Sequence, residues 1–71
     1  MMNAPFDPAA LKALRERRKL TKEGVALLAY CEDSAYEAWE NGDETPSPFW
    51  CERLAKALRC RVEDFFLRAK G

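Results

Sequence analysis

The amino-acid sequence predicts an all-α fold of five short helices packed in one compact domain. Capping residues followed by proline or by apolar residues at helical spacing recur along the chain, and no segment shows the alternation of a half-buried strand. A length of 71 residues is enough for one modest core. We therefore expect a single domain over residues 1–71, with residues 1–7 as a flexible N-terminal arm.

The first two helices are predicted from their N-terminal caps. Asp7-Pro8 places a capping carboxylate before a proline at the first helical position, and the apolar spacing that follows predicts a helix over about residues 8–18. Thr21 is the expected cap of a second helix that begins at Lys22. The core face of this second helix is predicted to hold Val25, Ala26 and either Leu28 or Ala29.

The third helix is predicted between the capping cluster Glu32-Asp33-Ser34 and the pair Asn41-Gly42. Tyr36 and Trp39 are three residues apart, so they share one face of this helix. Gly42 can adopt the left-handed conformation that commonly ends a helix.

Two further helices complete the predicted domain. Ser47-Pro48 repeats the signal of a cap followed by proline and opens the fourth helix, whose apolar positions are Cys51, Leu54, Ala55 and Leu58. A short fifth helix is expected around Val62, Phe65 and Phe66.

Charge is segregated along the chain. The 12 basic and 12 acidic residues sum to a net charge of zero. Residues 31–48 nevertheless hold six acidic residues and no basic one, whereas residues 7–30 and 49–71 each carry six basic residues against three acidic ones. The net charge therefore conceals an acidic middle segment between two basic flanks.

Composition argues against several classes of protein. The chain has no histidine, and its three cysteines, Cys31, Cys51 and Cys60, lack the C-x-x-C spacing, so we expect neither a disulfide framework nor a metal site nor any cofactor. Without a histidine to activate a nucleophile and without a glycine-rich phosphate loop, we do not expect an enzyme. No apolar run approaches the roughly 20 residues of a membrane span, and the N-terminus does not resemble a signal peptide. We expect a cytoplasmic chain with no membrane partner.

Taken together, the motifs resemble the lambda-repressor-like helix-turn-helix domain of the Cro/CI (XRE) type. The resemblance runs without gaps from the first predicted helix to the last, through Leu11-x-x-x-Arg15, Leu20-Thr21, Val25-Ala26, Trp39-Glu40-Asn41-Gly42, Pro46-Ser47 and Leu54-Ala55-Lys56-Ala57-Leu58. It implies that the second and third helices form a DNA-reading unit. It also implies a salt bridge between Arg15 and Glu40 that is structural rather than catalytic.

The resemblance further implies which residues meet double-stranded DNA. Thr21 and Lys22, at the start of the second helix, would contact phosphate. The third helix would contribute Asp33, Ser34, Glu37 and Ala38. The acidic residues among these depart from the family pattern. They are unfavourable next to DNA, because a carboxylate about 4 Å from a phosphate costs on the order of 1 kcal/mol in water. Asp33 or Glu37 could instead accept a hydrogen bond from a cytosine amino group.

Two aromatic residues also depart from the family pattern. Phe49 and Trp50 fall at positions of the fourth helix that are usually polar and point outward. Aromatic side chains are enriched in protein interfaces, so at least one of the two is predicted to lie in a dimer or partner contact. Burial of either ring in the core is the alternative.

Two functions are compatible with these features. The first is a small Cro/CI-type DNA-binding transcriptional regulator that grips two half-sites as a homodimer. A phage or mobile-element origin is expected for it, because the chain holds nothing beyond this domain. The alternative is a helix-turn-helix scaffold that binds a basic protein partner and not DNA. It would use Phe49 or Trp50 as an anchor and the carboxylates of Glu32, Asp33, Glu37, Asp43 and Glu44.

Overall fold

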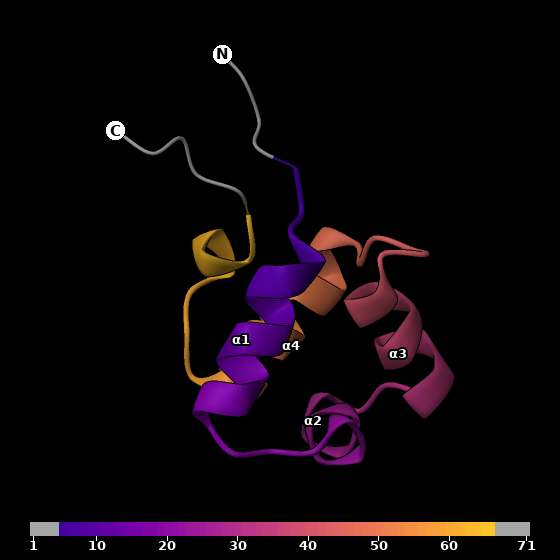
Figure 1. Ribbon diagram of the computed structural model, residues 1–71, viewed down its shortest axis with the longest axis vertical. Helices are drawn as coiled ribbons and strands as arrows, with labels where there is room; N and C mark the ends of the chain where they lie inside the picture. The colour runs from indigo at the N-terminus through magenta and orange to yellow at the C-terminus, as the bar shows by residue number, and fades with distance from the viewer. Residues whose placement is uncertain (1–4, 67–71) are drawn as a thin grey trace.

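The computed structural model describes residues 5–66, which form four α-helices and one short 3-10 helix (Figure 1). The elements in chain order are α1 (Pro8–Arg17), α2 (Lys22–Ala29), α3 (Asp33–Asn41), α4 (Pro48–Leu58) and η1 (Val62–Phe65). In Figure 1, α3 and η1 lie on opposite sides of α1. The predicted all-α class is confirmed, but the predicted count of five α-helices is wrong. No helix of the described segment has both the length and the apolar character to cross a membrane.

The fifth predicted helix is a single 3-10 turn. The backbone N–H of Arg61 donates to Asp64 Oδ2 at 3.0 Å, and the N–H of Asp64 donates to the carbonyl of Arg61 at 2.9 Å. The chain leaves the helical conformation at Phe66, which is extended and forms an isolated antiparallel bridge with Phe6. The apolar spacing of this segment predicts an α-helix, whereas the helical backbone ends after one turn, where Phe66 is extended and pairs with Phe6.

The N-terminal segment is held against this turn. The ring of Phe6 lies 6.3 Å from that of Phe65 and 6.0 Å from that of Phe66, and the N–H of Asp7 donates to the carbonyl of Phe65 at 2.7 Å. Within the predicted arm of residues 1–7, Phe6 and Asp7 thus contact η1 and Phe66. Residues 1–4 of that predicted arm lie outside the described residues.

Three of the predicted caps are formed. Side-chain oxygens of Asp7, Thr21 and Ser47 accept hydrogen bonds from the first turns of α1, α2 and α4 at 3.0, 3.0 and 3.4 Å. At the start of α3 the N-cap residue is Glu32, and its side chain makes no capping hydrogen bond. The expected capping by the Glu32-Asp33-Ser34 cluster is thus absent, and the first turn of α3 differs from those of the other three α-helices.

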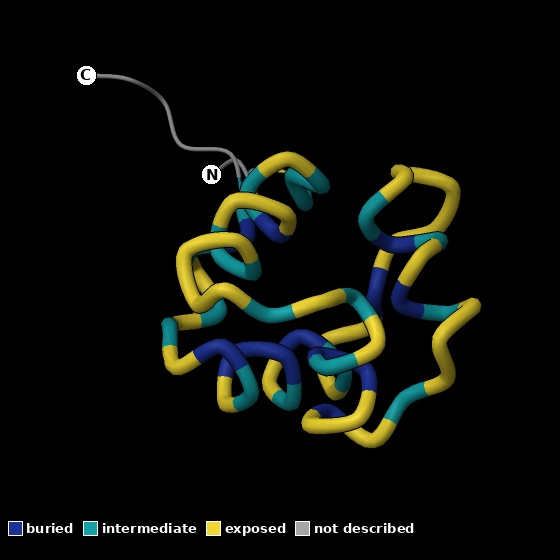
Figure 2. The backbone as a smooth tube through the Cα atoms, turned by 60° about the horizontal axis from the view of Figure 1, so that its bottom comes forward, coloured by how far each residue is buried: buried dark blue, intermediate teal, exposed yellow. Residues whose placement is uncertain are grey.

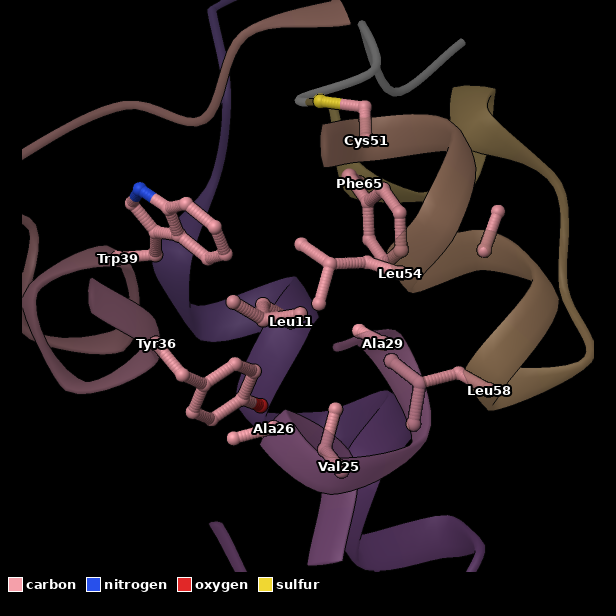
Figure 3. Close-up of a cluster of buried hydrophobic side chains, with 11 residues drawn as sticks. Leu11, Val25, Ala26, Ala29, Tyr36, Trp39, Cys51, Leu54, Leu58 and Phe65 are labelled. Carbon is pink, nitrogen blue, oxygen red and sulfur yellow. The ribbon is translucent and has the colours of Figure 1, made fainter. Parts of the chain in front are cut away.

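The core draws on all five elements (Figure 3). Its buried residues are Leu11, Val25, Ala26, Ala29, Tyr36, Trp39, Cys51, Leu54, Ala55, Leu58 and Phe65. Figure 2 shows the buried positions on the inner sides of the helices and the exposed ones on their outer sides. Of the two alternatives at the end of α2, Ala29 is buried and Leu28 is exposed. Ala29 lies four positions after Val25, which returns it to within about 40° of Val25 around the helix.

Between residues 5 and 66, three residues other than glycine have a positive φ: Lys19, Tyr30 and Arg59, at 58°, 63° and 55°. This left-handed conformation is unfavourable for side chains with a Cβ. Arg59 ends α4, its side chain is exposed, and its carbonyl accepts a hydrogen bond from Arg18 that a glycine would keep. A substitution at Arg59 therefore changes the backbone strain without removing a packed side chain.

Arg59→Gly is expected to raise the free energy of unfolding by about 0.5–1 kcal/mol in urea denaturation, because glycine adopts this conformation without strain. The matched control is Arg61→Gly, since Arg61 is also exposed but has a φ of −100°. That change should lower the stability. Equal losses in the two variants would contradict the explanation from backbone strain.

Candidate nucleic-acid interface

Helices α2 and α3 form a pair joined by a tight turn. Tyr30 ends α2 in the left-handed conformation, and the N–H of Cys31 donates back to the carbonyl of Ala26 at 3.0 Å. The chain then extends through Glu32 and enters α3. Helix α2 packs against both α3 and α4, so the pair rests on the body of the domain. Two short helices in this arrangement constitute a helix-turn-helix unit.

A hydrogen-bonded network centred on Arg15 fixes α3 to α1. Arg15 Nε donates to Glu40 Oε2 at 2.7 Å and Arg15 Nη2 to Oε1 at 3.2 Å, so the structure brings the two predicted partners together in a two-pronged contact. Arg15 Nη1 also donates to the carbonyl of Leu20 at 3.0 Å. The hydroxyl of Tyr36 donates to Glu40 Oε2 at 2.5 Å, a contact that the sequence reading missed.

This network is withdrawn from solvent. The side chains of Arg15 and Glu40 are only 12% and 3% exposed. Burial by itself raises the pKa of Glu40, but the hydrogen bonds from Arg15 and Tyr36 outweigh it and hold that pKa below its usual value. Burial and the hydrogen bond to Glu40 raise the pKa of Tyr36, so its hydroxyl remains a donor. Both shifts favour the hydrogen-bonded arrangement that orients α3.

The residues predicted to meet DNA lie along α2 and α3. Thr21, Asp33, Ser34 and Glu37 are exposed, while Lys22 and Ala38 are half-buried. The hydroxyl of Thr21 is already an acceptor in the cap of α2. The two helices are joined at this surface by an ion pair between Lys22 of α2 and Glu37 of α3.

Lys22 Nζ lies 3.6 Å from Glu37 Oε2, and these side chains are 41% and 57% exposed. A surface pair of this kind contributes about 0–1 kcal/mol. Lys22, which is predicted to contact a DNA phosphate, is therefore paired with the carboxylate of Glu37 in the isolated chain. The contact is weak enough for another anion to displace it.

The outer side of α3 and the loop after it are strongly acidic. Glu32, Asp33, Asp43 and Glu44 are exposed, and none of them forms an ion pair with another residue of the 5–66 segment. Asp43 and Glu44 follow Gly42, which ends α3 with a φ of 85°. These four carboxylates of the acidic middle segment thus lie at the surface.

Two arginines have roles that the sequence did not reveal. Arg18 Nε donates to the carbonyl of Leu58 at 2.9 Å, and its Nη2 donates to that of Arg59 at 3.0 Å. Arg53 Nε donates to the carbonyl of Ala29 at 2.8 Å. Arg18 therefore satisfies the C-terminal end of α4, and Arg53 that of α2. Their partners lie 24 to 41 residues away in the chain, and no local pattern connects them.

The two aromatics predicted to be outward differ in exposure. Phe49 is exposed at the start of α4, whereas Trp50 is half-buried and lies 5.8 Å, between ring centroids, from the core residue Trp39. The two rings also meet edge to face at 5.0 Å. The surface position predicted for this pair therefore applies to Phe49, while Trp50 borders the core.

The cysteines are reduced and offer little reactivity. Cys51 is buried, and Cys31 and Cys60 are half-buried. Burial raises the pKa of all three thiols, which disfavours the nucleophilic thiolate at neutral pH. Within residues 5–66, no three His, Cys, Asp or Glu side chains gather as a metal site would require.

The fold and the α2–α3 pair define a helix-turn-helix domain. The family described as "Helix-turn-helix domain" matches residues 9–65, so the chain belongs to that family. The restriction-modification controller protein C.AhdI from Aeromonas hydrophila has a similar structure, with a TM-score of 0.80 and 27% identity over 83% of this chain and 89% of that one. These matches confirm the resemblance to Cro/CI-type domains.

Two other proteins are also similar to the chain. The DNA-binding domain of the P22 c2 repressor has a TM-score of 0.78 with 22% identity, covering 87% of this chain and 82% of its own, and thus shares the fold. A curated relative from Acinetobacter baylyi is named a competence pilus inhibition repressor. It is 36% identical over 62 residues, which are 87% of this chain and 56% of the relative. The chain thus spans little more than half the length of that protein.

Proposed function

We propose that the chain is a DNA-binding transcriptional regulator of the Cro/CI type, and in particular a repressor. It acts as a homodimer in the cytoplasm, without a cofactor or enzymatic activity. The observation that carries this proposal is the α2–α3 unit, which is fixed on α1 by Arg15 and Glu40 and keeps Ser34 and Glu37 exposed. The names of the curated relative and of C.AhdI, a repressor and a controller protein, support a regulatory role.

Contacts to DNA are assigned from the surroundings of each residue. The N–H groups of the first turn of α3 lack a side-chain cap and can donate to a phosphate, as can Lys22 once it leaves Glu37. Ser34 can donate or accept at a base edge, and Ala38 offers a methyl group for contact with thymine. Asp33 and Glu37 can accept from the amino group of cytosine. A dimer would place two such units about 34 Å apart, one helical turn of DNA.

A titration of fluorescent pooled random duplexes over a series of salt concentrations tests this function. The unaltered chain should bind with an affinity that falls as salt increases. Lys22→Ala should weaken binding and reduce the slope of log affinity against log salt by about one, because one phosphate contact is lost. Lys12→Ala is the matched control, since Lys12 is exposed on α1 outside the helix-turn-helix unit. Absence of binding at low salt would refute the proposal.

One observation favours a second candidate function. The exposed carboxylates around α3 that have no ion-pair partner within residues 5–66 could attract a basic protein instead of DNA. In this case the chain would be a helix-turn-helix scaffold that binds protein. It would bind no duplex in the titration above, and reversing the charges of Asp33 and Glu37 would release its partner.

A further inference from the structure

An apolar surface remains uncovered beside the reading unit. Leu28, Tyr30 and Phe49 are 52%, 76% and 59% exposed, although each has a large apolar side chain. They border a hollow of about 410 Å³ between the end of α2 and the first turns of α4. Its remaining lining is charged. We call this surface the α2–α4 face, and it comprises Leu28, Tyr30, Phe49, Glu52, Arg53 and Lys56.

The aromatic part of this face is held in a fixed position. The guanidinium carbon of Arg53 lies 5.1 Å from the ring centroid of Tyr30 and 5.5 Å from that of Phe49. Arg53 itself is anchored by its hydrogen bond to the carbonyl of Ala29. Rings that are already ordered lose little conformational freedom when a partner covers them. Tyr30 has a left-handed φ of 63° at the end of α2 and presents its ring on this face.

The charges of the face indicate what can cover it. Glu52 and Lys56 are exposed one turn apart on α4, and neither forms an ion pair inside the described segment. A surface that carries opposite charges at such a spacing is complementary to itself. When two copies are related by a two-fold axis with their α4 helices antiparallel, Glu52 of each copy can face Lys56 of the other. The apolar residues beside them would then be covered as well.

We propose that a second copy of this chain docks on the α2–α4 face about a two-fold axis. This inference deepens the homodimer of the proposed function by assigning its surface. The dimer forms without DNA, and the face contains none of the residues assigned to DNA contact. Because the apolar area is small, association is expected at micromolar concentrations.

Sedimentation equilibrium on the folded chain without DNA tests the proposal at about 1–500 μM, the range in which small interfaces associate. The unaltered chain should show a reversible dimer. Glu52→Lys and Lys56→Glu should each weaken it by about tenfold or more, because each change creates two like-charge contacts per dimer. Lys12→Glu, an equal charge change on the exposed side of α1, should leave the dimer intact.

Mixing the two weakened variants gives the decisive measurement. The Glu52→Lys variant carries lysine at both positions, 52 and 56, and the Lys56→Glu variant carries glutamate at both. Both contacts of a mixed dimer therefore join opposite charges. The mixture should associate as strongly as the unaltered chain, with circular dichroism showing that each variant is folded. A mixture that stays monomeric, or an unaltered chain that stays monomeric throughout, would overturn the proposal. Duplex titration of each variant keeps this result separate from DNA binding.

Discussion

Glu40→Ala is expected to lower the free energy of unfolding by about 3 kcal/mol, because it leaves the guanidinium of Arg15 buried without its carboxylate partner. It also removes the acceptor of the Tyr36 hydroxyl. Urea denaturation followed by circular dichroism measures this loss. In a domain of this size the expected loss is a large fraction of the total stability.

Glu37→Ala provides the matched comparison, since it removes a carboxylate from the same helix but from an exposed ion pair. Its effect should stay below about 1 kcal/mol. A similar small loss in Glu40→Ala would show that the Arg15 network does not secure α3.

Acidification gives a second measurement of the same network. The pKa of Glu40 is lowered from 4.5, so the folded state favours its ionised form. This contribution is complete above the pKa of the unfolded chain and is lost as the pH falls through the lower pKa of the folded state. The difference in stability between the unaltered chain and Glu40→Gln should therefore shrink as the pH decreases below 4.5. A difference that stays constant would contradict the assignment.

Neutralising two acidic residues of the reading unit, with Asp33→Asn and Glu37→Gln together, is expected to tighten binding to mixed-sequence DNA by about tenfold or more at low salt. Each carboxylate near a phosphate costs on the order of 1 kcal/mol. The second change also releases Lys22 from its ion pair. Discrimination between a selected duplex and mixed DNA should decrease, because acceptors for cytosine are weakened.

The control for this experiment is Glu16→Gln with Glu63→Gln. Both residues are exposed and lie on α1 and η1, outside the helix-turn-helix unit. This control removes the same number of negative charges, so it should reproduce only the effect of overall charge. If both double variants bound mixed DNA equally well, the acidic residues of α3 would have no local role.

Helix starts were predictable because their signals are local. Asp7, Thr21 and Ser47 cap the helices that the sequence assigned to them, and Gly42 ends α3 as expected. The expected cap of α3 is not formed, because Glu32 occupies the N-cap position without a side-chain hydrogen bond. The sequence shows that Glu32, Asp33 and Ser34 carry side-chain oxygens, but it does not show whether these oxygens point at the free N–H groups of α3.

What the sequence left undetermined depends on contacts between distant residues. The α-helix expected around Val62 is one 3-10 turn because Phe66 pairs with Phe6. Similarly, spacing allowed either Leu28 or Ala29 in the core, and the packing of α2 against α4 decides for Ala29. At the candidate site, the sequence showed which types of residue α2 and α3 carry. The ion pair between Lys22 and Glu37 required the relative placement of two helices.

Arg15, Arg18 and Arg53 all direct their guanidinium groups at acceptors within the protein. The number of basic residues consequently overstates the number of side chains that are free to donate to a polyanion. Redesign toward stronger phosphate affinity would better add lysine or arginine at vacant outward positions than redirect these three, whose removal would expose unmatched helix ends and a lone carboxylate. Three of the 12 basic side chains of the flanks thus donate hydrogen bonds within the domain.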